Sequence, residues 1–171
     1  MADMLDKAVD FFWKKVDTII ISLISVYEKL FKKRVGNSAK NTVLQFVKFG
    51  IVGCSNTALS YIINVVTLLL LSQADFKWDY FVGNIVAFIL SVLWSFWWNY
   101  HYVFDNHKQQ SWWKILIKTY ASYAFTGLIL SNVFSYILVG QIGVSKYIAP
   151  LIILIVSVPV NFILNKLWAF K

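Results

Sequence analysis

The chain has 171 residues, of which 59% are hydrophobic and 18% aromatic, while only 14% carry a charge. This composition cannot supply the polar surface that a water-soluble domain needs. The single cysteine, Cys54, excludes an intramolecular disulfide framework and a thiolate metal cluster. The net charge of +8 favours an anionic membrane surface as the partner over nucleic acid. The composition therefore predicts one small integral membrane protein.

Residues 1–34 are predicted to form an amphipathic helix that does not cross the membrane. Apolar residues recur there at helical spacing, and charged residues occupy the opposite side. The longest uncharged stretch, 18–27, is only half of the roughly 20 residues that a span needs. The helix either lies on the cytoplasmic leaflet or packs on another subunit or a soluble partner, and the sequence leaves both open. Residues 35–43 are expected to link this helix to the membrane domain, 44–171.

Four long stretches without Asp, Glu, Lys or Arg make up most of the remaining chain. They run over 49–74, 80–104, 119–145 and 147–165. Each is long enough for a helix to cross a hydrocarbon core of roughly 30 Å, and the alternating segments of a β-barrel do not occur. The transmembrane helices are therefore predicted at about 46–72, 80–104, 115–139 and 147–168. Because the connections are short, we expect two antiparallel helical hairpins in an all-α membrane fold.

The distribution of Lys and Arg predicts the orientation of the four helices. Fourteen of the sixteen lie before the first span, between the second and third spans, or at the end of the chain, and only Lys77 and Lys146 lie on the opposite side. Since positively charged loops stay in the cytoplasm, both termini and the middle loop are expected there.

The ends of the second and fourth spans repeat one another. FWWNYHYVF (96–104) aligns without a gap with FILNKLWAF (162–170). The matched residues are Phe96 with Phe162, Asn99 with Asn165, and Phe104 with Phe170. The first and third spans agree more weakly, with FGIVG (49–53) over YAFTG (123–127). We interpret this as a duplicated hairpin whose copies are related by an axis along the membrane normal. The alternative is that two aromatic cytoplasmic ends resemble one another by composition.

With these motifs, residues 44–171 resemble the GtrA-like family of small bacterial membrane proteins. FGIVGCSNTALSY (49–61) resembles the family's glycine-rich first span, and both copies follow its F-x-x-N-x-x-aromatic-x-F signature. The resemblance implies a multi-pass protein of the bacterial cytoplasmic membrane that acts in cell-surface polysaccharide synthesis or in teichoic acid or O-antigen glycosylation. It also implies a polyprenyl-phosphate-linked sugar as the substrate and a membrane glycosyltransferase as a partner. The sequence departs from the family in its longer N-terminal helix and at Tyr100, where the family often has a basic residue.

Ion-coupled transport and catalysis are not supported by the residues of the spans. No Asp or Glu lies within them, although a proton-coupled exporter would need an intramembrane carboxylate. No carboxylate pair, metal-ligand spacing, nucleotide-binding loop or nucleophile–base set occurs. We therefore expect neither an enzyme nor a protein with a metal or other cofactor.

Amide and ammonium groups near the membrane edge are the candidate contacts to a lipid phosphate or a sugar. They are Asn56, Asn99, Asn161, Asn165, Lys48, Lys118 and Lys166. Asn99 and Asn165 stand out because each repeat copy has one near the cytoplasmic interface. The three lysines would converge on one headgroup if the spans form a bundle, since charge-assisted bonds to phosphate are strong. The structural alternatives are helix–helix hydrogen bonds and caps for the amides, and snorkelling for the lysines.

Two functions remain open from the sequence. In the first, the amide-lined bundle passes the headgroup of a polyprenyl-phosphate-linked sugar across the membrane while the tail stays among the lipids. In the second, the chain is an anchor that does not transport and recruits a glycosyltransferase through the N-terminal helix and the 105–118 loop. Four helices leave little room for a cavity within one protomer, so a homo-oligomer is expected.

Overall fold

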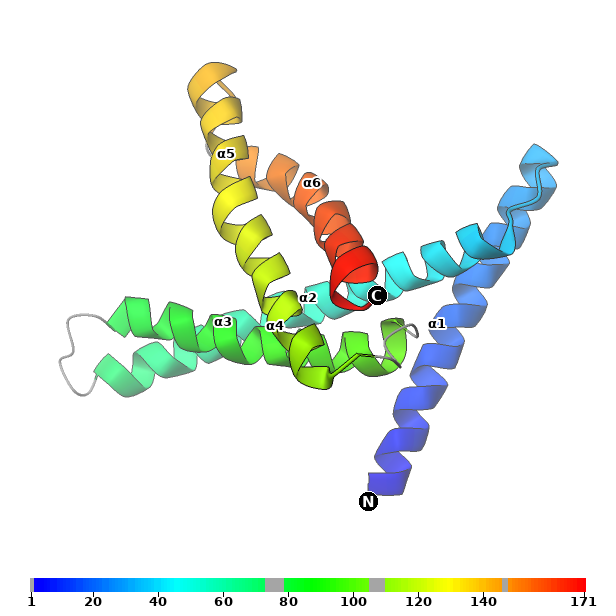
Figure 1. The fold of residues 1–171 in the computed structure, drawn as a ribbon, viewed down its shortest axis with the longest axis horizontal. Coiled ribbons are helices and arrows are strands. Elements are labelled where there is room, and N and C mark those ends of the chain that lie inside the picture. The colour runs from blue at the N-terminus through cyan, green and yellow to red at the C-terminus, as the bar shows by residue number, and fades with distance from the viewer. Residues whose placement is uncertain (1, 73–78, 105–109, 146–147) are drawn as a thin grey trace. The chain divides into compact units, whose positions relative to one another are not determined.

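The computed structural model describes residues 2–72, 79–104, 110–145 and 148–171, and every regular element in these ranges is helical (Figure 1). The elements are α1 (Ala2–Phe31), α2 (Asn37–Ser72), α3 (Asp79–Trp98), η1 (Asn99–Val103), α4 (Trp112–Ala124), η2 (Phe125–Leu130), α5 (Ser131–Ser135), η3 (Tyr136–Gln141), α6 (Ala149–Leu164) and η4 (Asn165–Ala169), where η marks a π-helical segment. The chain divides into two compact units, Met1–Phe49 and Gly50–Lys171, and the division falls within α2.

The first unit is an antiparallel pair made of α1 and the beginning of α2. Helix α1 ends at Phe31, and Lys32 then adopts a left-handed backbone conformation with φ of 48°. The Glu28 carboxylate stabilises the turn that follows, because it accepts a 2.7 Å hydrogen bond from the Val35 backbone N–H and forms a 3.1 Å ion pair with Lys40.

The segment 35–43, which was expected to be a linker, is helical from Asn37 onward. Asn37 and Ser38 are residue types that favour the start of a helix. Residues 39–43 contain neither Gly nor Pro, so nothing there ends the helix again. The first membrane helix therefore extends back toward α1, and only a short turn separates the two.

Four helices in the described ranges are long and apolar enough to cross a membrane. They are Asn37–Leu71, Phe81–Val103, Trp112–Gln141 and Leu151–Ala169. The third combines α4, η2, α5 and η3 into one continuous helix with two π-helical segments. The structure thus confirms the predicted all-α fold with four membrane-crossing helices.

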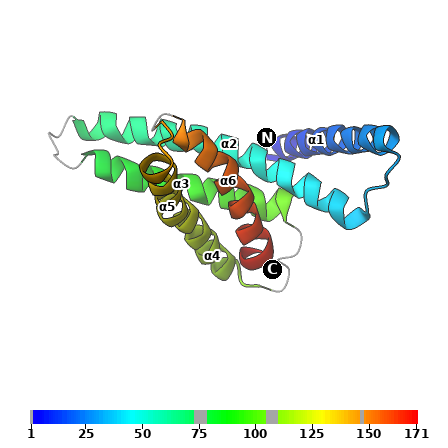
Figure 2. The same cartoon turned by 90° about the horizontal axis from the view of Figure 1, so that it is seen from above.

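The second unit contains two helical hairpins. Residues 50–72 of α2 run beside α3, where Asn64 Nδ2 donates to Asn84 Oδ1 (2.8 Å) and Trp94 Nε1 donates to Ser55 Oγ (3.1 Å). The α4–α5 helix and α6 lie side by side in both views and form the other hairpin (Figures 1 and 2).

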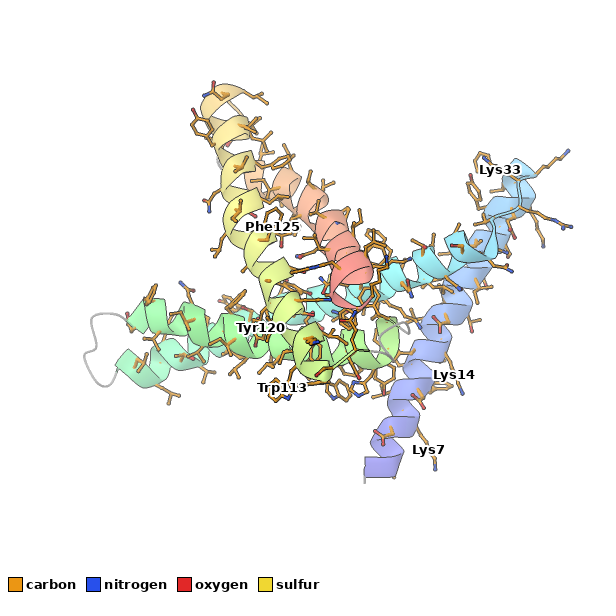
Figure 3. All side chains as sticks on the ribbon, in the orientation of Figure 1. Lys7, Lys14, Lys33, Trp113, Tyr120 and Phe125 are labelled. Atoms are coloured by element: carbon orange, nitrogen blue, oxygen red, sulfur yellow. The ribbon has the colours of Figure 1, made fainter. Side chains whose placement is uncertain are left out.

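Helix α4 joins the two hairpins because it packs across α3. The Tyr120 hydroxyl donates a 2.6 Å hydrogen bond to the Ile89 carbonyl oxygen at this crossing (Figure 3). The Tyr120 ring also meets the Phe88 ring edge to face, with 5.9 Å between the ring centres.

Candidate functional site

The two copies of the repeated signature adopt the same backbone structure. In each copy the asparagine begins a π-helical turn, and its carbonyl oxygen accepts the N–H of the phenylalanine five residues later. The bonds run from Phe104 N to Asn99 O (3.0 Å) and from Phe170 N to Asn165 O (2.9 Å). Since π-helical turns are rare, the shared geometry favours a duplication over a chance similarity of composition.

The four signature phenylalanines make reciprocal contacts between the copies. Phe96, the first residue of one copy, stacks on Phe170, the last of the other, with ring centres 6.2 Å apart. Phe104 and Phe162 make the equivalent contact at 5.9 Å. Such an exchange of first and last positions is what a two-fold relation between copies produces. All four side chains are at least 95% buried, so the signature holds the ends of α3–η1 and α6–η4 together.

The two signature asparagines are fully buried, and their amide N–H groups are used one turn back in their own helices. Asn99 Nδ2 donates to Ser95 Oγ (3.2 Å), whereas Asn165 Nδ2 donates to the Asn161 carbonyl oxygen (2.8 Å). In the described part of the chain, the side-chain oxygens of Asn99, Asn161 and Asn165 accept no hydrogen bond. These oxygens are therefore the atoms still available to a ligand or to water.

A polar groove of about 490 Å³ lies among α2, α3 and α4. Its lining residues are Asn56, Thr57, Ser60, Tyr61, Asn64, Asn84, Ala87, Phe88, Ser91, Val92 and Tyr123. None of them carries a formal charge. Asn56 Oδ1 is buried and accepts no hydrogen bond from the described residues, so this predicted site residue keeps an acceptor free in the groove.

A short hydrogen-bond chain connects the groove to the signature. The Tyr123 hydroxyl lies 2.7 Å from Ser95 Oγ, and either oxygen is able to donate. Ser95 Oγ in turn accepts the Asn99 amide, which also interacts with Tyr123. Asn99 is thus connected to the groove through two side chains, and no contact of this kind is found for Asn165 in the described residues.

The three candidate lysines have separate partners. Lys118 Nζ donates to the Trp168 carbonyl oxygen (3.0 Å) and to Gln110 Oε1 (3.1 Å). Lys166 Nζ lies 5.5 Å from the centre of the Phe162 ring. Lys48 belongs to the first unit, where its Nζ pairs with Asp17 at 2.8 Å. Convergence of these lysines on one phosphate stays a prediction.

Sequence reasoning missed Tyr123 as a site residue. A tyrosine in a span rich in aromatic residues carries little signal by itself. Comparison of the two repeat copies could have identified it, because Tyr123 aligns with Phe49 and therefore adds a hydroxyl group where the other copy has none. That hydroxyl is the group that connects the groove to Ser95.

Comparison with known proteins places this fold in a family. Residues 48–170 match the GtrA/DPMS transmembrane domain. The chain is 30% identical over 113 residues to the cell wall teichoic acid glycosylation protein GtcA of Listeria monocytogenes, and 25% identical over 113 residues to the protein of the same name from Listeria innocua. Each alignment covers 64% of this chain and 76% of the relative. No solved structure matches the chain. With four apolar helices and a family match over most of its length, the chain is a multi-pass membrane protein that belongs to the GtrA/DPMS transmembrane-domain family.

Proposed function

We propose that this protein translocates a polyprenyl-phosphate-linked sugar across the bacterial cytoplasmic membrane, for the glycosylation of a cell-wall polymer such as teichoic acid. Both termini would lie in the cytoplasm. The relatives named for teichoic acid glycosylation support the process, and the family match supports the membrane setting. The role is not catalytic, and a membrane glycosyltransferase would supply or use the lipid-linked sugar.

The uncharged polar groove is the observation that carries this proposal. Sugar hydroxyls lose their water on entering a membrane, so they need hydrogen-bond partners in the protein. The groove offers amide and hydroxyl groups from three helices, including the free Asn56 oxygen and the Tyr123 hydroxyl. Its volume of about 490 Å³ lies within the ~300–1,000 Å³ range of small-molecule sites. The hydrocarbon tail would remain outside the groove.

Transport by this route would be facilitated rather than coupled to protons. The four charge-free stretches contain no carboxylate that would act as a proton relay. Consumption of the lipid-linked sugar on the outer side would then give the movement its direction.

A second candidate function, a membrane anchor for a glycosyltransferase, is favoured by the surface of α1. Five large apolar side chains of this helix are between 59% and 73% exposed: Phe11, Ile19, Leu23, Leu30 and Phe31. An exposed apolar face of this kind suits a lipid surface or a partner helix. In this second role, α1 would bind the partner and the groove would carry no substrate.

Translocation by the purified protein distinguishes the two functions. We expect the full chain in liposomes to bring a labelled polyprenyl-phosphate sugar to the opposite leaflet faster than empty liposomes do. Asn56→Ala and Tyr123→Phe should slow this movement. Asn132→Ala is the matched control, because among the described residues the Asn132 amide donates to the Leu128 carbonyl of its own helix, and Asn132 does not line the groove. A folded wild-type protein that leaves the label in place would favour the anchor.

A further inference from the structure

A second groove, of about 390 Å³, lies between α4–η2 and α6–η4. It is lined by Ala121, Ser122, Phe125, Leu164 and Trp168. The only hydroxyl group among these side chains, that of Ser122, donates to the Lys118 carbonyl oxygen (2.9 Å) within its own helix. Apart from the indole N–H of Trp168, the lining groups are therefore apolar or already hydrogen-bonded.

Two of the residues that line the groove lie at junctions between α-helical and π-helical backbone. Phe125 is the first residue of η2 (Figure 3), and Leu164 is the last residue of α6 before η4 begins. A π-helical turn inserts an extra residue into the helix, and such turns occur frequently at functional sites. Phe125 and Trp168 stay 44% and 47% exposed on the groove.

Among the described residues, the ammonium group of Lys118 has no carboxylate partner, and it lies at one end of this groove. Lys118 comes one turn before Ala121 and Ser122 on α4, and its Nζ bonds to the Trp168 carbonyl oxygen and Gln110 Oε1. Its ammonium group also lies 5.9 Å from the centre of the Trp168 ring. All of these partners are neutral, and no carboxylate pairs with Lys118 among the described residues. Near a membrane, a fixed and half-buried cation of this kind favours binding of an anion.

We propose that this groove binds the polyprenyl chain of the lipid carrier next to its phosphate, with the phosphate on Lys118. The inference rests on the proposed function and names the part of the protein that holds the tail. Lys118 and Phe125 are seven residues apart, or roughly 10 Å along a helix, so an anionic head and the first part of a single hydrocarbon chain fit along α4. A groove of about 390 Å³ between two helices suits one chain better than the paired chains of a diacyl lipid.

Helix α4 forms a wall of both grooves, which is consistent with one ligand having two chemically different parts. Tyr123 faces the polar groove, whereas its neighbour Ser122 lines the apolar one. Consecutive residues of a helix point about 100° apart, so the two surfaces lie on different faces of the same helix. The sugar and the tail would thus contact separate sides of α4, with Lys118 near the phosphate that joins them.

Lys118 also has a structural role that the test must separate from binding. Its bond to the Trp168 carbonyl satisfies one of the last acceptors of η4, as lysines commonly do at helix ends. A purely structural Lys118 would change thermal stability when it is replaced. It would not distinguish a polyprenyl phosphate from the corresponding alcohol.

The experiment uses the full chain in phosphatidylcholine nanodiscs and a polyprenyl phosphate that carries a photoreactive group in its isoprenoid chain. We expect crosslinks within residues 121–125 and 164–168. Unlabelled polyprenyl phosphate should compete, and polyprenol and phosphatidylglycerol should not. Lys118→Gln should weaken binding about tenfold or more, as loss of a charged hydrogen bond does, while Lys118→Arg should retain it. Ala121→Trp should abolish crosslinking by filling the groove, and Ile117→Trp, which is 67% exposed on the same helix, should not.

Translocation of the lipid-linked sugar, measured on the same samples, separates this inference from the proposed function. Crosslinks outside the groove together with normal translocation would overturn the inference alone. Equal competition by phosphatidylglycerol or polyprenol would also overturn it, since the site would then be a general lipid contact. Crosslinks in the groove without any translocation would support the binding site and contradict the transport function.

Discussion

The rings of Phe104 and Phe170 lie 4.7 Å apart between centres, with an interplanar angle of 32°. These residues end the two copies of the signature, and they meet each other as well as the first phenylalanine of the opposite copy. The contact between equivalent residues lies where a two-fold axis relating the copies would pass. The duplicated sequence is therefore also a structural joint between the two hairpins.

Loss of this contact should destabilise the protein more than loss of an exposed phenylalanine. Phe104→Ala and Phe170→Ala each remove a side chain that is at least 98% buried, so we expect each to cost about 3 kcal/mol of unfolding free energy. The double variant should cost less than the sum, because both single changes remove the same ring pair. Unfolding in mixed detergent micelles measures the three values, and Phe81→Ala, at a site 56% exposed, is the control. Additive effects would mean that the two rings do not act as a pair.

The sequence was sufficient to predict the four membrane helices and their pairing. Span length is fixed by bilayer thickness, and charged residues are costly inside it, so charge-free stretches locate the helices directly. The segment 35–43, predicted to be a linker, is helical from Asn37 onward. Polar residues such as Asn and Ser occur both in loops and at helix starts, so composition alone does not distinguish the two.

The two grooves and the reciprocal contacts of the signature phenylalanines depend on tertiary packing, so helical periodicity does not predict them. The π-helical segments of the described residues shift the helix faces locally, and no simple residue pattern marks where such a shift occurs. Lys118 illustrates the limit. Its position near the membrane edge was evident from the sequence. Its bond to the Trp168 carbonyl was not, because that bond joins two spans that are far apart in the sequence.

Acid should loosen the turn between α1 and α2. The Val35 backbone N–H, and after it Lys40, hold the pKa of the Glu28 carboxyl below its ordinary value of 4.5. Because the folded-state pKa is depressed, the stabilisation of the turn by the Glu28 carboxylate is fully present above pH 4.5. It is lost as the pH falls through the folded-state pKa. Spin labels at the exposed positions Lys29 and Ser38 should report a broader distance distribution at a pH below the folded-state pKa of Glu28. In Glu28→Gln the distribution should be independent of pH; a persistent acid transition would assign it to another group.

The arrangement of charged residues predicts which loops face the cytoplasm. In a Cys54→Ser background, which removes an exposed native thiol, cysteines at Gln73 and Gln141 should react with an impermeant reagent added to intact cells. A cysteine at Gln109 should react only after the cells are opened. Labelling of Gln109 in intact cells would reverse the proposed orientation.

Asn99 and Asn165 should differ in function although the repeat makes them equivalent. Both are fully buried and donate within their own helices, so alanine at either position should cost on the order of 1 kcal/mol of stability. Only Asn99 is connected to the polar groove, through Ser95 and the Tyr123 hydroxyl. Asn99→Ala should therefore slow translocation of the lipid-linked sugar in liposomes severalfold, and Asn165→Ala should leave it nearly unchanged.

Ser95→Ala provides the independent check on the role of Asn99, because it breaks the same hydrogen-bond chain and leaves the asparagine in place. It should slow translocation as Asn99→Ala does, with a similar small loss of thermal stability. Translocation rates and melting temperatures for Asn99→Ala, Asn165→Ala and Ser95→Ala are measured on the same preparations. If Asn165→Ala slows translocation as much as Asn99→Ala, both asparagines act through the joint between the hairpins, and the connection to the groove has no separate effect.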